Sequence, residues 1–441
     1  MNRDFTNLFN RVADFLLLLL FLFVVSIGRP VVDPSVLVRE ENVTISRIYF
    51  YSQMLSAVFL SIFCFVNIGR ARWNTSIAFF IPYIFIVITS LIVTVDFTTS
   101  LNHLLRLVAI VASTDLYIRL RGPREMIRIL AITLLLVNVL SIIAVFAFPS
   151  IGKHSATENT FLANAGNWRG ITQQKNALGR FGSIGAVLLI AYSDMMNWPK
   201  LLSYAFGAIC VANVFGSQSG TGIIALVVCM ALYFRVGGRN TSPIWDVFLL
   251  VGVAALVGVM LLAPDMLFDL LGKDASGTGR TRIWAFCWDV IRSEPLLGYG
   301  FDAGAAYWRP VMQSVIFPSA VDAHNAYIQT VVDLGWGGLI ALGAALFMAL
   351  RAAFRQNPRI DEPTRRANTA FGVIIVGAMV VGCSEISSFS ITSDVGFMTF
   401  IAIAGISTNR RFRQEEGVET FMEQAFPSLN AANPAPEQQE A

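Results

Sequence analysis

The chain has 441 residues, of which 55% are hydrophobic and only 14% are charged, and its formal net charge is +3. A soluble globular protein carries about a quarter charged residues, so an ordinary core cannot absorb this much apolar surface. A lipid bilayer can, and one span needs roughly 20 mainly apolar residues. The composition therefore excludes an ordinary soluble protein and predicts a membrane protein.

The apolar runs are continuous rather than alternating, which predicts helices instead of the strands of a closed barrel. We expect an all-α polytopic membrane protein with about twelve transmembrane helices and one large outer loop. The first run follows Arg3 and Arg11 and has no clear cleavage site after it, which favours an uncleaved span. The expected spans are 12–28, 48–68, 76–95, 101–118, 128–147, 179–194, 200–216, 220–236, 245–263, 325–350, 369–387 and 393–408.

The distribution of positive charge predicts the sidedness, because Lys and Arg are enriched in cytoplasmic loops. Nineteen of the 32 Lys and Arg residues fall on the side of the two termini and twelve on the other, with Arg106 inside a span. Both termini are therefore expected in the cytoplasm. Nine of the twelve outer charges lie in the loops 148–180 and 264–323. They are either solvated surface charge or the binding site of an anion.

The predicted organisation has four parts: helices one to nine in 1–263, the outer loop with an interfacial helix in 264–323, helices ten to twelve in 324–408, and a cytoplasmic tail in 409–441. The tail is rich in Glu, Pro and Asn, a composition typical of disorder. Four of the five cysteines fall in apolar runs, so no disulfide framework is expected. The histidines form no ligand cluster with a cysteine pair, and we expect neither a metal site nor a cofactor.

The loop 264–323 contains a predicted amphipathic helix at about 281–292. An apolar stripe at helical spacing is formed by Ile283, Phe286, Cys287 and Val290. A second strip, spaced four apart, is formed by Arg280, Trp284, Trp288 and Arg292. Such a helix can lie in the membrane interface with its apolar side down. Arginine suits phosphate because its planar fork donates two hydrogen bonds. The two Trp side chains either anchor the helix in the interface or contact a sugar ring.

Further polar residues stand at the outer ends of predicted spans. His324-Asn325 opens the tenth span, where His324 is either a structural residue or a general base. The cations before and at the start of the sixth span lie near a helix N-terminus, which favours anions; they are Arg169, Lys175 and Arg180. His103 and Arg106 share one face of the fourth span, and Arg106 either faces a cavity or extends to the interface. Weaker acidic candidates are Asp333, Glu385 and Asp394.

These residues resemble the bacterial O-antigen ligase and O-antigen polymerase superfamily, and most of all the succinoglycan-type exopolysaccharide polymerases. The resemblance is strongest over about 160–345. It rests on Gly279-Arg280-Thr281 with Trp284, Pro295, Gly298-Tyr299-Gly300, His324-Asn325, Gly335, Gly338, Lys175-Asn176 and Ser217-x-Ser219. Many ligases have an Arg after the first of these serines, where this chain has Gln218.

The resemblance implies a metal-independent, inverting glycosyltransferase in the bacterial inner membrane. Its donor would be a glycan on undecaprenyl diphosphate at the periplasmic face. Arg280 would bind the diphosphate, together with a cation from 169–180, of which we favour Lys175. His324 would deprotonate the acceptor hydroxyl. Additional substrate-binding candidates are Arg169, Arg180, Arg282, Trp284 and Asn325. Preorganised cations can stabilise a leaving diphosphate without a metal, so the residues fit this chemistry.

The leading hypothesis is a polysaccharide polymerase that moves a growing chain onto a lipid-linked repeat unit. The alternative within the class is a ligase that moves the glycan to lipid A core or another acceptor. A glycolipid transporter would need charged or broken helices at the bilayer midplane, and most polar content here is at the outer end. A non-catalytic scaffold is a further alternative. We expect the lipid bilayer, a chain-length regulator and a flippase as partners, and no nucleic acid.

Overall fold

The computed structural model describes residues 3–24, 39–66, 74, 76–155, 164–172, 174–237, 280–316, 322–355, 360–385, 388–391 and 393–408. These residues form helices, and the only β pairing among them is an isolated bridge between Lys153 and Trp168. The helices are α1 (Arg3–Val24), α2 (Arg39–Phe65), α3 (Ile81–Ser90), α4 (Phe97–Arg121), α5 (Pro123–Ala147), α6 (Pro149–Gly152), α7 (Lys175–Ala191), α8 (Lys200–Gly216), α9 (Gly220–Gly237), α12 (Arg280–Ser293), α13 (Gly304–Val315), α14 (Ala326–Phe354), α15 (Glu362–Gly382) and α16 (Asp394–Gly405), with 3-10 turns η2 (Ser76–Phe80) and η4 (Ser193–Met195).

The all-helical fold class is confirmed for the described chain. Eleven of the twelve expected spans coincide with a helix there, and the ninth, 245–263, lies outside the described residues, as does the predicted tail 409–441. Three described helices, α4, α5 and α14, are long and apolar enough to cross a membrane. Shorter apolar helices lie at 50–65, 76–90, 200–216, 220–236 and 394–405. The number of twelve spans and the large outer loop stay predictions.

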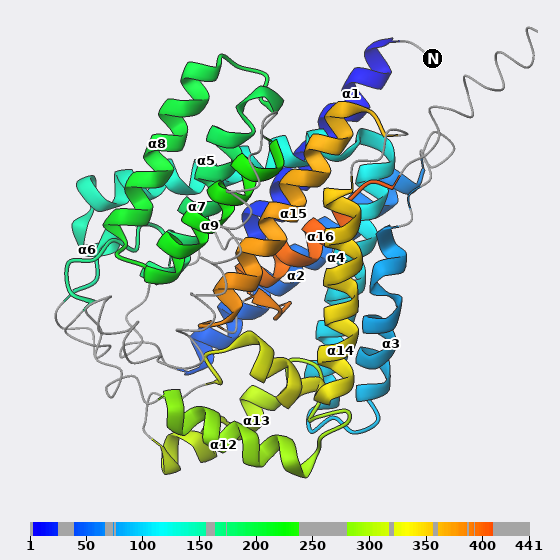
Figure 1. The fold of residues 1–441 in the computed structure, drawn as a ribbon, viewed down its shortest axis with the longest axis vertical. Helices are drawn as coiled ribbons and strands as arrows, with labels where there is room; N and C mark the ends of the chain where they lie inside the picture. Colours follow the sequence, from blue (N-terminus) through cyan, green and yellow to red (C-terminus); the bar gives the residue numbers. More distant parts are fainter. Residues whose placement is uncertain are drawn as a thin grey trace, which may run out of the picture.

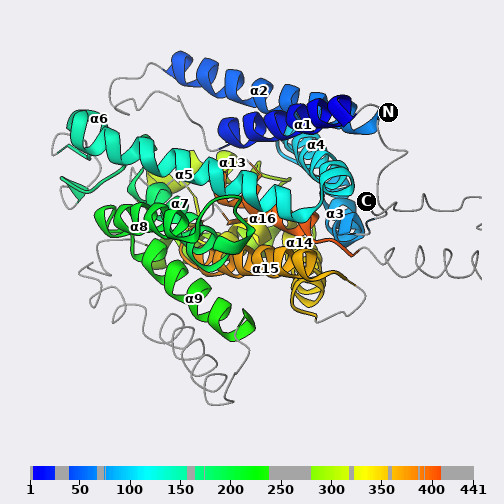
Figure 2. The same cartoon turned by 90° about the horizontal axis from the view of Figure 1, so that it is seen from above.

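Most long helices run side by side, and α12 and α13 lie across one end of this bundle (Figure 1). Seen from above, α1 and α2 stand on one side and α9 on the other, with α7 and α16 between them (Figure 2). Helix α7 packs against α5, α8 and α9, and α16 packs against α15 and α4. Every residue of α16 from Val395 to Gly405 is buried. The centre of the bundle is therefore protein, and the exposed apolar side chains lie around it.

Several helix ends follow directly from local sequence. Asp96, Asp361 and Ser393 begin α4, α15 and α16, and each side chain accepts a hydrogen bond from the backbone N–H three residues later. Such N-caps satisfy donors that the helix itself leaves unpaired. Helix α4 ends at Gly122, which has a φ of 85°, and Pro123 starts α5. These signals fix where the spans begin and hence which polar residues stand at the bundle ends.

Helix α14 is broken near the end of the bundle on which α12 and α13 lie. Gly335 has φ 65° and ψ −173°, a backbone conformation that essentially only glycine adopts. The turn after α12 docks into this break through backbone hydrogen bonds: Tyr299 N to Val332 O at 3.0 Å, Gly300 N to Asp333 O at 2.8 Å, and Trp336 N to Pro295 O at 2.8 Å. The outer lobe, defined as residues 280–316, is thereby attached to the bundle.

The apolar stripe of α12 is buried, and it faces protein. Ile283, Cys287 and Val290 pack in one cluster with Met312 of α13 and Val331 of α14. The helix at 281–292 is confirmed, whereas α13 was not among the predicted elements. The lobe is therefore a small packed unit with its own apolar core against α14.

A candidate site of cations, carboxylates and a histidine

His324 stands directly before α14, at the end of the bundle that carries the outer lobe. Its backbone has a φ of 47°, which is unusual for a residue with a side chain. Asp322 Oδ1 accepts a hydrogen bond from the His324 backbone N at 2.8 Å and lies 3.3 Å from Nδ1 of the same residue. The imidazole is about one-third exposed. With Nδ1 turned to a carboxylate, Nε2 is left to accept a proton from outside.

Arg280, the first residue of α12, lies near two carboxylates. Burial lowers the pKa of its guanidinium, while the nearby Glu385 and Asp322 carboxylates raise it. Asp322 is the same residue that contacts His324, so the cation and the imidazole share one acidic neighbour. The two residues that the sequence singled out as diphosphate ligand and base are thus brought to one place.

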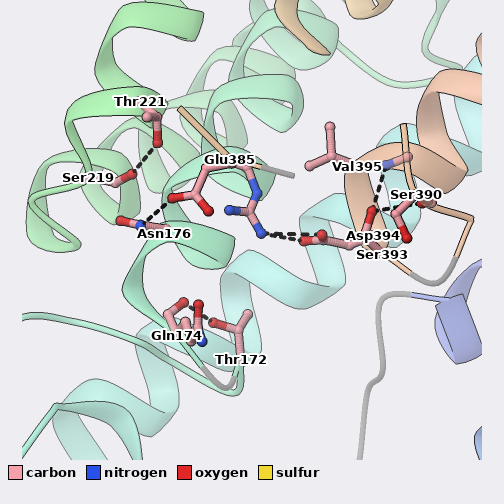
Figure 3. Close-up of polar contacts among 12 residues, drawn as sticks. Thr172, Gln174, Asn176, Ser219, Thr221, Glu385, Ser390, Ser393, Asp394 and Val395 are labelled. Atoms are coloured by element: carbon pink, nitrogen blue, oxygen red, sulfur yellow. Dashed lines mark hydrogen bonds and ion pairs between the residues drawn. The ribbon is translucent and has the colours of Figure 1, made fainter. Parts of the chain in front are cut away.

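Helix α7 contributes the second set of cations. Asn176 Nδ2 donates to Glu385 Oε1 at 2.7 Å, so the first turn of α7 reaches the carboxylate that neighbours Arg280. One turn later, Arg180 donates from Nη2 to both oxygens of Asp394, each at 3.2 Å. Figure 3 shows Glu385 between Asn176 on one side and Asp394 at the start of α16 on the other. Three parts of the chain that are far apart in sequence therefore meet here: α7, the start of α12 and the segment from Glu385 to Asp394.

Arg180 and Lys175 are both buried, with 6% and 8% of their surfaces exposed. Nε of Arg180 is buried and has no hydrogen-bond partner among the described residues. Nζ of Lys175 donates to the backbone O of Gln218 at 3.4 Å, which brings it to the segment before α9. A buried cation with an unpartnered donor, as at Nε of Arg180, is suited to an anionic ligand, because little water competes for it.

The segment 217–221 closes the site from the side of α9. A Cβ on Gly222 would lie 2.8 Å from the backbone carbon of Gly179, so α9 and α7 are in backbone contact there. Ser219 Oγ accepts from the Gly222 N–H at 3.2 Å, and it lies 3.2 Å from Thr221 Oγ1 (Figure 3). The Ser219 hydroxyl therefore acts as a helix cap for α9.

The other predicted site residues have different surroundings. Arg169 is buried, and its guanidinium donates to the carbonyls of Ile151 and Ser150 at 2.8 and 3.2 Å, which holds the loop before α7 on α6. Asn325 caps α14: its side chain accepts from the N–H of Tyr327 and Ile328 at 3.0 Å each. Arg282 is exposed, and it points about 200° around α12 from Arg280, since two residues apart on a helix face opposite sides.

Trp284 faces the His324 segment. Its indole Nε1 donates to the backbone O of Ala323 at 2.9 Å, and its ring packs against the core of the outer lobe. Trp288 and Arg292, the other members of the predicted strip, lie away from the site. Trp288 stacks on Trp336 with ring centroids 6.1 Å apart, and Arg292 forms an exposed ion pair with Asp289.

A second polar cluster lies deeper, around Asp302. Its carboxylate accepts from Ser390 Oγ and the Ile391 N–H at 3.1 Å each, and it stands 4.0 Å from Nδ1 of His103. Burial raises the pKa of Asp302, whereas His103, these hydrogen bonds and Arg106 lower it. Arg106 donates to Gln53 and is buried. The two residues predicted to share one face of the fourth span thus point into protein.

The sequence assigned Glu385 a minor place, offered Asn176 only as part of a motif, and did not single out Asp322. Glu385 and Asn176 are 209 positions apart, so no local pattern could pair them. Asp322 had a local signal, since it lies two residues before a candidate base. Within the described residues, no group of three or more His, Cys, Asp or Glu side chains is placed to hold a metal ion.

The fold and the site are those of a helical, multi-pass membrane protein with buried cations and a histidine gathered at one end of its bundle. Residues 205–343, from α8 to α14, match the family model described as O-antigen ligase. The chain is also 27% identical over 199 residues to the exopolysaccharide production protein ExoQ of Rhizobium meliloti (strain 1021). That match covers 41% of this chain and 45% of the relative, so it spans less than half of either. The predicted resemblance to the O-antigen ligase and polymerase superfamily, of the exopolysaccharide type, is confirmed.

Proposed function

We propose that this chain is a polysaccharide polymerase of the bacterial inner membrane. It transfers a glycan from undecaprenyl diphosphate to a lipid-linked repeat unit at the periplasmic face, for exopolysaccharide or O-antigen synthesis. The observation that carries the proposal is that Arg280 and His324 have Asp322 as a common acidic neighbour. A cation for a diphosphate and a base for a hydroxyl are the two groups that such a transfer needs.

In the proposed reaction, Nε2 of His324 takes the proton of the acceptor hydroxyl. The hydroxyl oxygen forms a bond to the anomeric carbon, and the bond from that carbon to the diphosphate oxygen breaks. Undecaprenyl diphosphate leaves with the bonding electrons, and attack from the opposite side inverts the anomeric centre. Asp322, on the Nδ1 side of the ring, stabilises the imidazolium that forms.

Negative charge grows on the leaving diphosphate, and the cations that stabilise it are Arg280, Lys175 and Arg180. The unpartnered Nε of Arg180 and the low exposure of Lys175 support this role, since charge-assisted hydrogen bonds gain strength away from water. Trp284, Asn325 and Arg169 support the site through the backbone contacts described above. Arg282, on the exposed side of α12, is proposed to meet the more distant part of the lipid-linked substrate. The reaction is proposed to need no metal ion and no other cofactor.

A ligase that delivers glycan to lipid A core or another acceptor is the alternative, and the match to a family model described as O-antigen ligase favours it. The similarity to an exopolysaccharide production protein favours the polymerase. The acceptor distinguishes them. A deletion strain that accumulates single lipid-linked repeat units supports a polymerase, whereas long lipid-linked chains left unattached support a ligase. For the cell, the proposal includes cytoplasmic termini, a flippase that supplies the donor, and a chain-length regulator.

The direct test uses purified protein with lipid-linked repeat units in a buffer without divalent metal. We expect chain extension by the wild type and losses of about 100-fold or more in Arg280→Ala and His324→Ala, typical of removed transition-state groups. Arg292→Ala is the matched control, because this Arg lies on the same helix in an exposed ion pair worth little. Full extension by either site variant, or strict dependence on a divalent metal, contradicts the mechanism.

A further inference from the structure

The residue before His324 is held from two sides. Ala323 is fully buried, and its two backbone polar groups are bound by side chains of different helices. Its N–H donates to Oε1 of Gln329 on α14 at 3.2 Å, and its carbonyl oxygen accepts from Nε1 of Trp284 on α12 at 2.9 Å. A buried backbone group left unpaired is costly, so both contacts constrain this peptide.

Gln329 is itself oriented by a third residue. Its Nε2 donates to Oδ1 of Asp333 one turn later at 3.1 Å, and both side chains are buried. An amide accepts on one side and donates on the other, and here both functions are used at once. Glutamate in this position keeps the acceptor for Ala323 but, when ionised, has no donor for Asp333. The site therefore requires glutamine in particular, rather than any polar residue.

The peptide that these contacts hold leads into strained backbone. His324 has a φ of 47°, and a residue with a side chain in such a region costs on the order of 1–3 kcal/mol. Strain of this kind persists only when surrounding contacts over-determine it. The contacts of Ala323 also connect α12, which begins with Arg280, to the segment that carries His324. These contacts thus set the distance between the Arg280 guanidinium and the His324 imidazole.

We propose that Gln329 is a positioning residue for the transfer reaction: together with Trp284 it holds the Ala323 peptide, and so sets where the imidazole of His324 stands relative to Arg280. This inference rests on the proposed function, in which His324 is the base. Gln329 itself does not touch the substrate. It acts through the backbone, and a shift of the base by about 1 Å is enough to reduce turnover about 100-fold.

The first test measures steady-state kinetics of chain extension for Gln329→Leu and for Thr330→Val. Thr330 is the next residue of α14 and is equally buried, and among the described residues its hydroxyl donates to the Ala326 carbonyl of its own helix. We expect Gln329→Leu to lower kcat by about 10- to 100-fold with little change in KM for the donor, because orientation and not binding is lost. Thr330→Val should keep both constants within about 3-fold. A wild-type kcat in Gln329→Leu overturns the proposal.

The second test is a rescue. Gln329→Glu places two carboxylates side by side, so we expect low activity at neutral pH. Relative to the wild type at the same pH, its activity should partly recover toward acid, where one of the two carboxylates holds a proton. Adding Asp333→Asn restores a donor to the pair, since the new amide donates to one Glu oxygen while the other accepts from Ala323. We expect the double variant to recover to within about 3-fold of the wild type, as coupled neighbours do in a double-mutant cycle. A double variant no better than Gln329→Glu contradicts the assigned hydrogen bonds.

A third measurement does not need activity, and it separates this inference from the proposed function. The rate at which diethyl pyrocarbonate modifies His324 is followed by mass spectrometry in the wild type and Gln329→Leu, with His154 as the internal reference. We expect the rate at His324 to change by about 3-fold or more and the rate at His154 to stay the same, because only His324 loses the contacts that hold its backbone. An inactive wild type would refute the transferase, whereas an unchanged His324 rate would refute the positioning.

Discussion

Replacing Gly335 with alanine tests how the outer lobe is attached to the bundle. A Cβ at this position would lie 2.2 Å from both the carbonyl carbon and the oxygen of Leu296, and 2.6 Å from the N of Leu297. These are backbone atoms, so no side-chain rotation relieves the clash. The φ of 65° with ψ −173° adds a conformation that alanine does not tolerate. The backbone term is about 1–3 kcal/mol and the overpacking term a further 1–3 kcal/mol.

We therefore expect Gly335→Ala to lower the free energy of unfolding by about 2–6 kcal/mol, or to release the turn 295–300 from α14. Gly343→Ala, eight residues later on the same helix, is the matched control, because a Cβ there meets nothing within 4 Å. It should stabilise α14 by about 0.5–1 kcal/mol. The assay is thermal unfolding of the purified proteins in one detergent, followed by limited proteolysis of the lobe. Equal melting temperatures and cleavage patterns for the two variants would refute this account of the break.

Three further predictions concern single side chains. Asn325→Ala should lower the free energy of unfolding by about 1–2 kcal/mol through loss of the cap and of the Nδ2 bond to the Cys383 carbonyl. Asn325→Asp keeps the cap but has no donor for that carbonyl, so its melting temperature should lie between those of the wild type and Asn325→Ala. Because burial raises the pKa of Asp302, the folded state keeps a proton that the unfolded state has released. Stability should therefore fall as pH rises from the unfolded pKa to the folded one; Asp302→Asn should remove this component, and a pH-independent difference between the two proteins speaks against it. Burial also raises the pKa of the Cys287 thiol to about 12. A maleimide at pH 8 should therefore leave Cys287 unlabelled in the native protein and label it after denaturation. Rapid labelling of the native protein would contradict this expectation.

The positions of the helices were largely readable from the sequence, because two local signals act together there. Continuous apolar runs locate the helices, and residues such as Asp96 and Ser393 define their beginnings through side-chain caps. The break in α14 was not predicted, although Gly335 was noticed within a motif. Its cause is the arrival of the turn 295–300 from elsewhere in the chain, and a local pattern does not contain that contact.

The candidate site divides in the same way. Arg280 and His324 were found from residue type and from the loop in which they stand. Their acidic neighbours were not paired with them, because Glu385 reaches Arg280 only after α7, α12 and α15 have packed. Arg169 shows the opposite limit: a cation in the right loop satisfies backbone carbonyls instead. Charge in a sequence identifies candidates, and packing decides their use.

The attachment of the outer lobe has a consequence for how such a chain can diverge. Main-chain groups at 295–300 and 332–337 form the junction, so the junction depends little on which side chains the turn carries. Substitutions on the exposed surface of the lobe leave the anchor intact, so the contacts of this surface can change one residue at a time. An insertion between Arg280 and Gly300 has a different effect, because it moves the cation relative to the anchor. The exposed surface of the lobe is thus free to vary in composition, whereas the stretch from Arg280 to Gly300 is constrained in length.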